Sequence, residues 1–219
     1  MILAVAATQI EMDYLYRIAS ATRSSRLVCG VGPVESCLRL TRKLEADSSI
    51  SKVINFGVAG AYLRGDTGNN LEMLDICLAE TEILGDLGIC FPMRIDDLPA
   101  EVAHRTRYTL DPRMLEVAGN VLEKNSISYH QGNFITVMSV SGTRQRGSLL
   151  QQKYNGLCEN MEGASLARVC HEFRKPFVEL RSISNYVEDR DLSRWNLEKA
   201  CENAAYVASL VINELEKNQ

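Results

Sequence analysis

Short runs of apolar and β-branched residues alternate along the chain with longer segments whose apolar residues recur at helical spacing. The short runs predict strands at 2–7, 27–30, 52–56, 75–82, 134–140 and 177–183. The longer segments predict helices at 11–19, 33–45, 112–124, 162–173 and 195–215. Strands that alternate with helices form a sheet covered by helices, so the pattern predicts an α/β sandwich with a mostly parallel or mixed sheet.

Composition limits the partners of such a chain. Its 219 residues, 46% of them hydrophobic, suffice for one α/β domain over 1–219. A net charge of −4 with interspersed signs offers no broad basic surface for nucleic acid. The apolar start at 1–7 is too short to cross a membrane and lacks a basic leader, so we expect a buried strand there.

Cysteine and histidine usage indicates a reducing compartment and no metal site. The seven cysteines are odd in number and no two have Cys-x-x-Cys spacing, which favours reduced thiols in a cytoplasmic protein. The three histidines are scattered, and none forms a metal-ligand pair with a cysteine at typical spacing.

The first predicted strand is followed by an acidic segment that contains Glu11. Sites in α/β sheets lie beyond the strand ends, where a carboxylate can act as a general base for water. An acid that complements the dipole of the following helix is the alternative. The first cation after this strand is Arg17, and a phosphate site normally needs cationic donors, so the segment favours water as the nucleophile.

A small-residue segment, 57–61, follows the predicted strand 52–56. Glycines allow a ligand to approach the backbone, so Val58, Ala59 and Gly60 are candidate contacts, although a plain tight turn is the interpretation that the segment favours. The segment lacks the Gly-x-Gly-x-x-Gly pattern and a Walker-type lysine, which leaves dinucleotide and nucleoside triphosphate binding without support.

Two further polar residues stand at predicted element ends. Glu162 begins a helix, where its carboxylate can accept hydrogen bonds from two adjacent hydroxyl groups, as a ribose diol requires, or can simply complement the helix dipole. Asn185 follows the predicted strand 177–183, where it is either a turn residue or a hydrogen-bonding group for a ligand.

In order and spacing, these segments resemble the purine nucleoside phosphorylase/nucleosidase superfamily over nearly the whole chain. The matching pieces are 7–11, 30–32, 55–60, 73–76, 160–162 and 176–185. The resemblance implies a three-layer α/β/α sandwich with a central mixed sheet, a purine nucleoside as ligand, a homo-oligomer, and neither metal nor organic cofactor. It implies that Glu11 activates water, that Met161 and Glu162 contact the ribose, and that Asn185 engages N7 of the purine. Asn160 and Ser184, which adjoin these residues, are further candidate substrate contacts. Val140 and Ser141 fall near the base pocket.

Two departures from the adenine-specific nucleosidases bear on the base. Those enzymes have Asp where Asn185 stands and Ser where Val58 stands. An Asp can be protonated and give its proton to N7, whereas the Asn amide can donate to N7 and O6. The sequence therefore favours a 6-oxopurine such as hypoxanthine over adenine, whose amine would face the amide donor to donor, a mismatch of roughly 1–3 kcal/mol.

The run 184–195 is similar to that of the futalosine hydrolases, which release hypoxanthine from futalosine in an alternative menaquinone pathway. Futalosine carries a benzoate, and we expect Arg190 or Arg194 to pair with its carboxylate and Trp195 to pack on its ring. A surface loop that caps the last helix is the competing interpretation. Alternatives for the whole chain are a methylthioadenosine/S-adenosylhomocysteine nucleosidase, an inosine phosphorylase, and a nucleoside-binding protein without catalysis.

Overall fold

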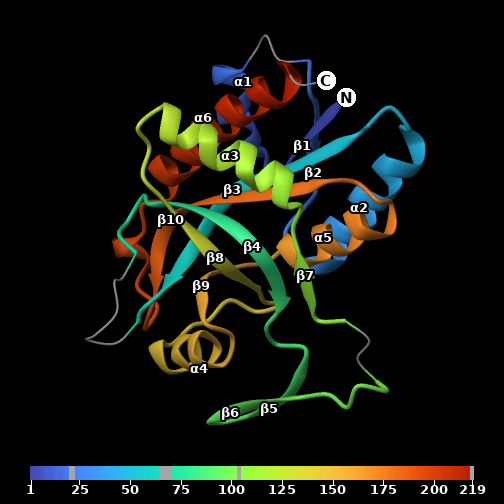
Figure 1. The fold of residues 1–219 in the computed structure, drawn as a ribbon. Helices are drawn as coiled ribbons and strands as arrows, with labels where there is room; N and C mark the ends of the chain where they lie inside the picture. The colour runs from blue at the N-terminus through green and yellow to red at the C-terminus, as the bar shows by residue number, and fades with distance from the viewer. Residues whose placement is uncertain (20–22, 65–70, 103–104, 218–219) are drawn as a thin grey trace.

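The computed structural model describes residues 1–19, 23–64, 71–102 and 105–217 (Figure 1). Within these residues the main sheet has eight strands in the order β10-β4-β8-β9-β3-β1-β2, with β7 paired to β4. Its strands are β1 (Ile2–Ala6), β2 (Ser25–Val28), β3 (Lys52–Tyr62), β4 (Ile76–Leu84), β7 (Arg107–Thr109), β8 (Tyr129–Thr136), β9 (Gly156–Asn160) and β10 (Phe177–Val187). A separate hairpin contains β5 (Gly88–Phe91) and β6 (Arg94–Asp97).

The sheet is mixed, and part of it closes on itself. Parallel pairs join β1 to β2 and β3, β10 to β3, and β8 to β4 and β9, while β10–β4, β3–β9 and β4–β7 are antiparallel. Because β10 pairs with both β3 and β4, the strands β10, β4, β8, β9 and β3 form a closed ring. Closure satisfies strand edges that would otherwise be open.

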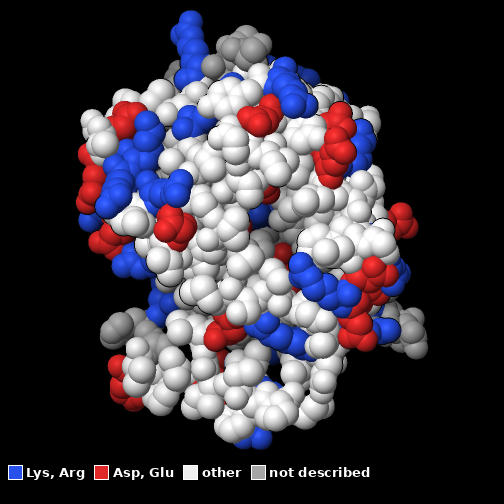
Figure 2. Space-filling model, turned by 180° about the vertical axis from the view of Figure 1, so that it is seen from behind, with Lys and Arg blue, Asp and Glu red and all other residues white. Residues whose placement is uncertain are grey.

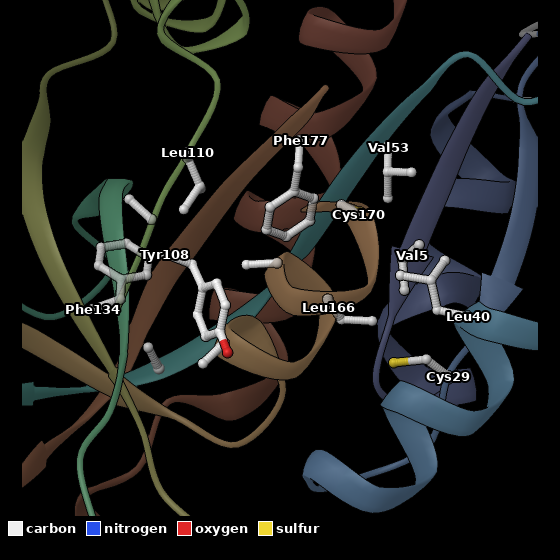
Figure 3. Close-up of a cluster of buried hydrophobic side chains, with 14 of the residues drawn as sticks. Val5, Cys29, Leu40, Val53, Tyr108, Leu110, Phe134, Leu166, Cys170 and Phe177 are labelled. Carbon is white, nitrogen blue, oxygen red and sulfur yellow. The ribbon is translucent and has the colours of Figure 1, made fainter. Parts of the chain in front are cut away.

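Helices cover both faces of the sheet, which confirms the predicted three-layer α/β/α sandwich. On one face lie α1 (Gln9–Ile18), α3 (Pro112–Lys124) and α6 (Leu197–Lys217), and on the other lie α2 (Pro33–Ala46) and α5 (Gly163–Glu172). The short helix α4 (Arg144–Tyr154) lies near the β5–β6 hairpin. Figure 3 shows the core beside α2 and α5, where Leu40, Leu166 and Cys170 lie with Val5 and Phe177 of the sheet.

Side-chain caps explain where two of the helices begin. The Thr8 side chain accepts a hydrogen bond from Glu11 N, and the Glu11 carboxylate accepts one from Thr8 N, so the two residues form a capping box for α1. The predicted cap of α3 is confirmed, because Asp111 accepts from the backbone of Arg113 and Met114 while proline occupies the first helical position.

Several predicted boundaries are wrong. β3 continues through 57–60, where a turn was expected, because Gly57 and Gly60 leave room for side chains from neighbouring elements. β10 continues past a bulge between Ile183 and Asn185, so Asn185 is a strand residue. β8 ends at Thr136 instead of 140, and the sequence pattern missed α4, β9 and the β5–β6 hairpin.

Candidate active site

A cavity of about 300 Å³ lies beside β3 and β10 and at the end of β9, where the predicted site residues converge. All of them except Arg194 line it: Glu11, Val58, Ala59, Gly60, Val140, Ser141, Asn160, Met161, Glu162, Ser184, Asn185, Arg190 and Trp195. They come from the start of α1, from β3, from the segment before α4, from the β9–α5 junction, from β10 and from the segment before α6. Figure 2 shows a face whose middle is mostly uncharged, with basic and acidic atoms visible deep in a central hollow.

Glu11 is buried, with 4% of its surface exposed, and both of its carboxylate oxygens are held. Oε2 accepts from Thr8 N (2.9 Å) and Thr8 Oγ1 (2.8 Å), and Oε1 accepts from Val58 N (3.3 Å). Burial raises the pKa of Glu11, and the nearby Arg181 charge only partly opposes this shift. A carboxylate with a raised pKa is a stronger base than an exposed glutamate, which suits proton abstraction from water.

Glu162 is placed by the end of β9 and directs its carboxylate toward buried donors. It is the N-terminal cap residue of α5, yet its side chain makes no capping hydrogen bond. Instead Oε1 accepts from Gly32 N (3.1 Å) and Oε2 accepts from Arg181 Nη2 (3.3 Å). The carboxylate therefore faces the cavity and is not used to cap the helix.

The first turn of α5 is capped instead by the Asn160 side chain. Its Oδ1 accepts from the backbone N–H groups of Glu162 (2.9 Å) and Gly163 (2.8 Å), and its Nδ2 donates to Glu82 Oε1 (2.6 Å). Asn160 lines the cavity as predicted, but these partners give its carboxamide a supporting role beneath Glu162.

Asn185 reaches the cavity from β10, just beyond the bulge. Its Oδ1 accepts from Ser184 Oγ (2.9 Å), and its Nδ2 donates to Tyr186 O (3.1 Å). An amide nitrogen has two hydrogens and a carbonyl oxygen two lone pairs, so each end keeps capacity for a ligand. Ser184 Oγ also lies 3.3 Å from Ala59 O, which ties this pair of residues to β3.

Sequence reasoning missed Arg181, which lies at the centre of the site with 2% of its surface exposed. Its Nη2 pairs with Glu179 Oε1 (2.8 Å) as well as with Glu162, and its Nη1 donates to Val58 O (3.3 Å). Burial works against its charge, but the surrounding carboxylates outweigh burial and raise the pKa of Arg181. The sequence did contain a signal for this role, because Arg181 interrupts the apolar run 177–183. A charged residue in a buried strand is nearly always paired, so acidic partners were to be expected around it.

Glu159 was also missed as a site residue, although the resemblance drew attention to its segment. It accepts from Ser141 N (2.8 Å), Ser141 Oγ (2.7 Å) and Tyr62 Oη (3.2 Å), and burial raises its pKa. Glu159 therefore holds Ser141 at the wall of the cavity, and Ser141 was predicted to lie near the purine.

The two candidate arginines of the segment before α6 have different surroundings. The Arg190 guanidinium lies 4.9 Å from the centre of the Trp195 ring, and both residues line the main cavity. Arg194 pairs with Glu188 at 2.8 Å and lines only a small neighbouring cavity.

The described residues contain no group of three or more His, Cys, Asp or Glu side chains that could hold a metal ion. None of the described helices combines the length and apolar character that crossing a bilayer requires.

Comparisons with known proteins agree with this architecture. The sequence model of the Phosphorylase superfamily matches residues 14–213. Futalosine hydrolase from Thermus thermophilus is 30% identical over 80% of this chain and 74% of its own length. A 5'-methylthioadenosine/S-adenosylhomocysteine nucleosidase from Maridesulfovibrio salexigens is 29% identical over 86% of this chain and 80% of its own. A futalosine hydrolase mutant from Helicobacter pylori superposes with a TM-score of 0.85 at 20% identity, covering 97% and 98% of the two chains.

The chain belongs to the Phosphorylase superfamily, as the resemblance implied. Within it, the similar proteins are N-glycosyl hydrolases of nucleosides, and this chain is an enzyme of that class.

Proposed function

We propose that the chain hydrolyses the N-glycosidic bond of futalosine and releases hypoxanthine, in the cytoplasm and as a step of menaquinone biosynthesis. The observation that supports this most is the arrangement of Glu11 and Glu162 around Arg181 below a cavity that Asn185 also lines. A base, a diol acceptor and a purine-binding amide are the groups that this hydrolysis needs.

In the proposed mechanism the bond between ribose and base loosens first, which leaves an oxocarbenium-like ribose. Glu162 accepts hydrogen bonds from the two ribose hydroxyls and orients the ring. Glu11 removes a proton from the attacking water, and such general-base catalysis is typically worth about 10²–10⁴-fold. Asn185 donates to the departing purine and stabilises its growing negative charge.

The choice of base follows from the chemistry of Asn185. Its Nδ2 donates to Tyr186 O (3.1 Å), and because a carbonyl oxygen can only accept, this contact distinguishes the nitrogen end of the amide from its oxygen end. The remaining Nδ2 hydrogen can donate to N7 or O6 of hypoxanthine. An adenine amine in place of O6 would meet this donor with another donor, so hypoxanthine is preferred.

Arg190 is the better candidate for the benzoate carboxylate of futalosine. It lines the cavity together with Trp195, whereas Arg194 is paired with Glu188. Replacement of Arg190 by alanine should raise the KM for futalosine by about tenfold or more, the value of a charge-assisted hydrogen bond. Arg194→Ala is the matched control and should leave that KM nearly unchanged. Equal KM values for Arg190→Ala and the unmodified enzyme would contradict the assignment.

The deciding experiment measures base release from futalosine, inosine and methylthioadenosine side by side, with and without phosphate. The proposal expects hypoxanthine from futalosine at a rate that phosphate does not change. Preferred release of adenine would indicate a methylthioadenosine/S-adenosylhomocysteine nucleosidase, and phosphate-dependent turnover would indicate an inosine phosphorylase. If no nucleoside is cleaved but binding persists, the chain is a binding protein. Glu11→Ala should abolish hydrolysis and retain nucleoside binding.

The cavity is proposed to be completed by a second copy of the chain. Val31 and Val140 line it, yet 54% and 41% of their surfaces are exposed, and Ile10 of α1 is 61% exposed. Exposed apolar residues at the rim of a site are typical of interaction surfaces. Light scattering after gel filtration should give twice the chain mass of 24.4 kDa, or a higher multiple, and a monomer that is fully active would exclude this arrangement.

A further inference from the structure

Two glutamate side chains from different strands meet in full burial beneath Glu162. Glu82 of β4 and Glu179 of β10 are both 0% exposed. A Cβ atom added to Gly163, the first residue of α5, would overlap both Glu82 Oε1 and Glu179 Oε2. The two carboxyl groups therefore converge on the same point below the start of α5.

The hydrogen bonds around this pair leave one oxygen without a donor. Glu82 Oε1 accepts from Asn160 Nδ2 (2.6 Å), Glu82 Oε2 accepts from Thr136 Oγ1 (2.7 Å), and Glu179 Oε1 accepts from Arg181 Nε (2.8 Å). Glu179 Oε2 has no donor in the part of the chain that the structure describes. An unpaired buried acceptor is costly, and two ionised carboxylates side by side repel each other. A proton on Glu82 Oε1, donated to Glu179 Oε2, removes both difficulties.

Charges around the pair indicate which carboxyl keeps the proton. Burial and the Glu179 charge raise the pKa of Glu82 well above its ordinary value. Burial also raises the pKa of Glu179, but there the adjacent Arg181 charge opposes the shift. The other titratable groups that face the pair are Glu162 at the start of α5 and the Cys158 thiol of β9, whose own pKa burial raises well above the usual range.

Both members of the pair are connected to Glu162 by separate contacts. Glu82 is held by Asn160, whose Oδ1 accepts from Glu162 N (2.9 Å). Glu179 holds Arg181, whose Nη2 donates to Glu162 Oε2 (3.3 Å). One contact fixes the backbone of Glu162 and the other fixes its carboxylate.

We propose that Glu82 and Glu179 share one proton and act as a unit that positions Glu162 for the ribose. They are positioning residues, because they act through Asn160 and Arg181. The ribose part of this statement rests on the proposed function, whereas the shared proton does not.

The proton is tested by NMR of protein that carries a labelled carboxyl carbon at every glutamate. At neutral pH one signal should have the shift of a protonated carboxyl, and it should vanish in Glu82→Gln. If Glu82→Gln removes a carboxylate signal instead, the shared proton is refuted. Should that variant fail to fold, Glu179→Gln provides the second test: its amide can donate to an ionised Glu82, so the protonated signal should again be lost, and its persistence would overturn the proposal.

The positioning role is tested by base release from the best ribonucleoside substrate and its 3′-deoxy analogue. In Glu82→Gln, an amide nitrogen placed to donate to Glu179 would also face the Asn160 Nδ2 donor, so the hydrogen bond from Asn160 would be lost. Because Asn160 also holds the backbone of Glu162, the substitution should displace Glu162. We expect kcat/KM for the ribonucleoside to fall by about tenfold or more, and the loss for the analogue to be much smaller, because the analogue lacks a hydroxyl that Glu162 binds. Ile212→Val, a core change in α6, is the control for stability and should affect both substrates equally.

Equal losses for both substrates in Glu82→Gln would overturn the positioning role. Failure of the proposed function has a different result, since the unmodified enzyme would then release no hypoxanthine from futalosine, whereas the positioning role is read on whichever ribonucleoside it cleaves. The NMR experiment detects the proton shared by Glu82 and Glu179 whether or not the proposed function holds.

Discussion

Gly57 of β3 faces the Glu11 carboxylate and the Arg181 guanidinium, so Gly57→Ala should displace the proposed base without disrupting the fold. A Cβ at this position would lie 2.9 Å from Arg181 Nη1 and closer still to Glu11 Oε1, whereas ordinary contacts begin at 3.4 Å. Glu11 Oε1 must therefore retreat by about 1 Å, and a misplacement of this size costs about a hundredfold in rate. The retreat also weakens the 3.3 Å hydrogen bond from Val58 N, which is worth about 1 kcal/mol of unfolding free energy.

The assay compares kcat for base release in Gly57→Ala and in Gly142→Ala, where an added Cβ meets nothing within 4 Å. We expect kcat to fall by about two orders of magnitude in the first variant and to stay near the original value in the second. Thermal unfolding should show a decrease in Tm of about 2–4 °C for Gly57→Ala. If folded Gly57→Ala turned over as fast as the control, the position of Glu11 would not matter for the rate, and its assignment as the base would fail.

Four further predictions concern Glu11, Asn185 and Asp111. Because burial raises the pKa of Glu11, kcat/KM should begin to fall at a pH above the ordinary glutamate value of 4.5 as the solution is acidified. The same raised pKa opposes folding of the ionised form, so the stability of the unmodified chain relative to Glu11→Gln should decrease as the pH rises from below about 4.5 to neutral, as measured by urea unfolding. Asn185→Asp should shift the ratio of adenine to hypoxanthine release toward adenine by about tenfold or more, read by chromatography of the freed bases. Asp111→Ala removes the cap of α3 and should lower the unfolding free energy by about 1 kcal/mol without changing kcat.

The layer architecture was predictable because it depends on repeated, local patterns. Alternating strand and helix periodicity gave the class of fold, and Asp111-Pro112 gave the start of α3 to the residue. The glycine-containing segment 57–60 was misread as a turn, because the sequence does not reveal that Glu11 and Arg181 come from elsewhere to fill the space beside Gly57. Helix α4 was missed since its surface is largely polar and its apolar residues form no clear stripe.

The site was predictable where a residue type matches a chemical task at a strand or helix end. Glu11, Glu162 and Asn185 were found in this way, although their roles stay predictions. Arg181 and Glu82 lie inside strands, where sequence patterns indicate packing, and their importance follows only from which strands become neighbours. The segment before Arg17 contains no cation, as its sequence shows, but the sequence does not reveal that β10 brings Arg181 beside Glu11 in the same cavity.

An arginine under the cavity does not by itself make a phosphate site, because every nitrogen of Arg181 is already engaged. Nε donates to Glu179, Nη2 to Glu162 and Nη1 to Val58 O. Binding phosphate would break a buried ion pair, which typically costs about 3–5 kcal/mol when one partner is lost. The Glu11 and Glu162 carboxylates would also face the anion as like charges. The cation therefore stabilises the two ionised acids of the site, and this charge balance favours neutral water as the nucleophile.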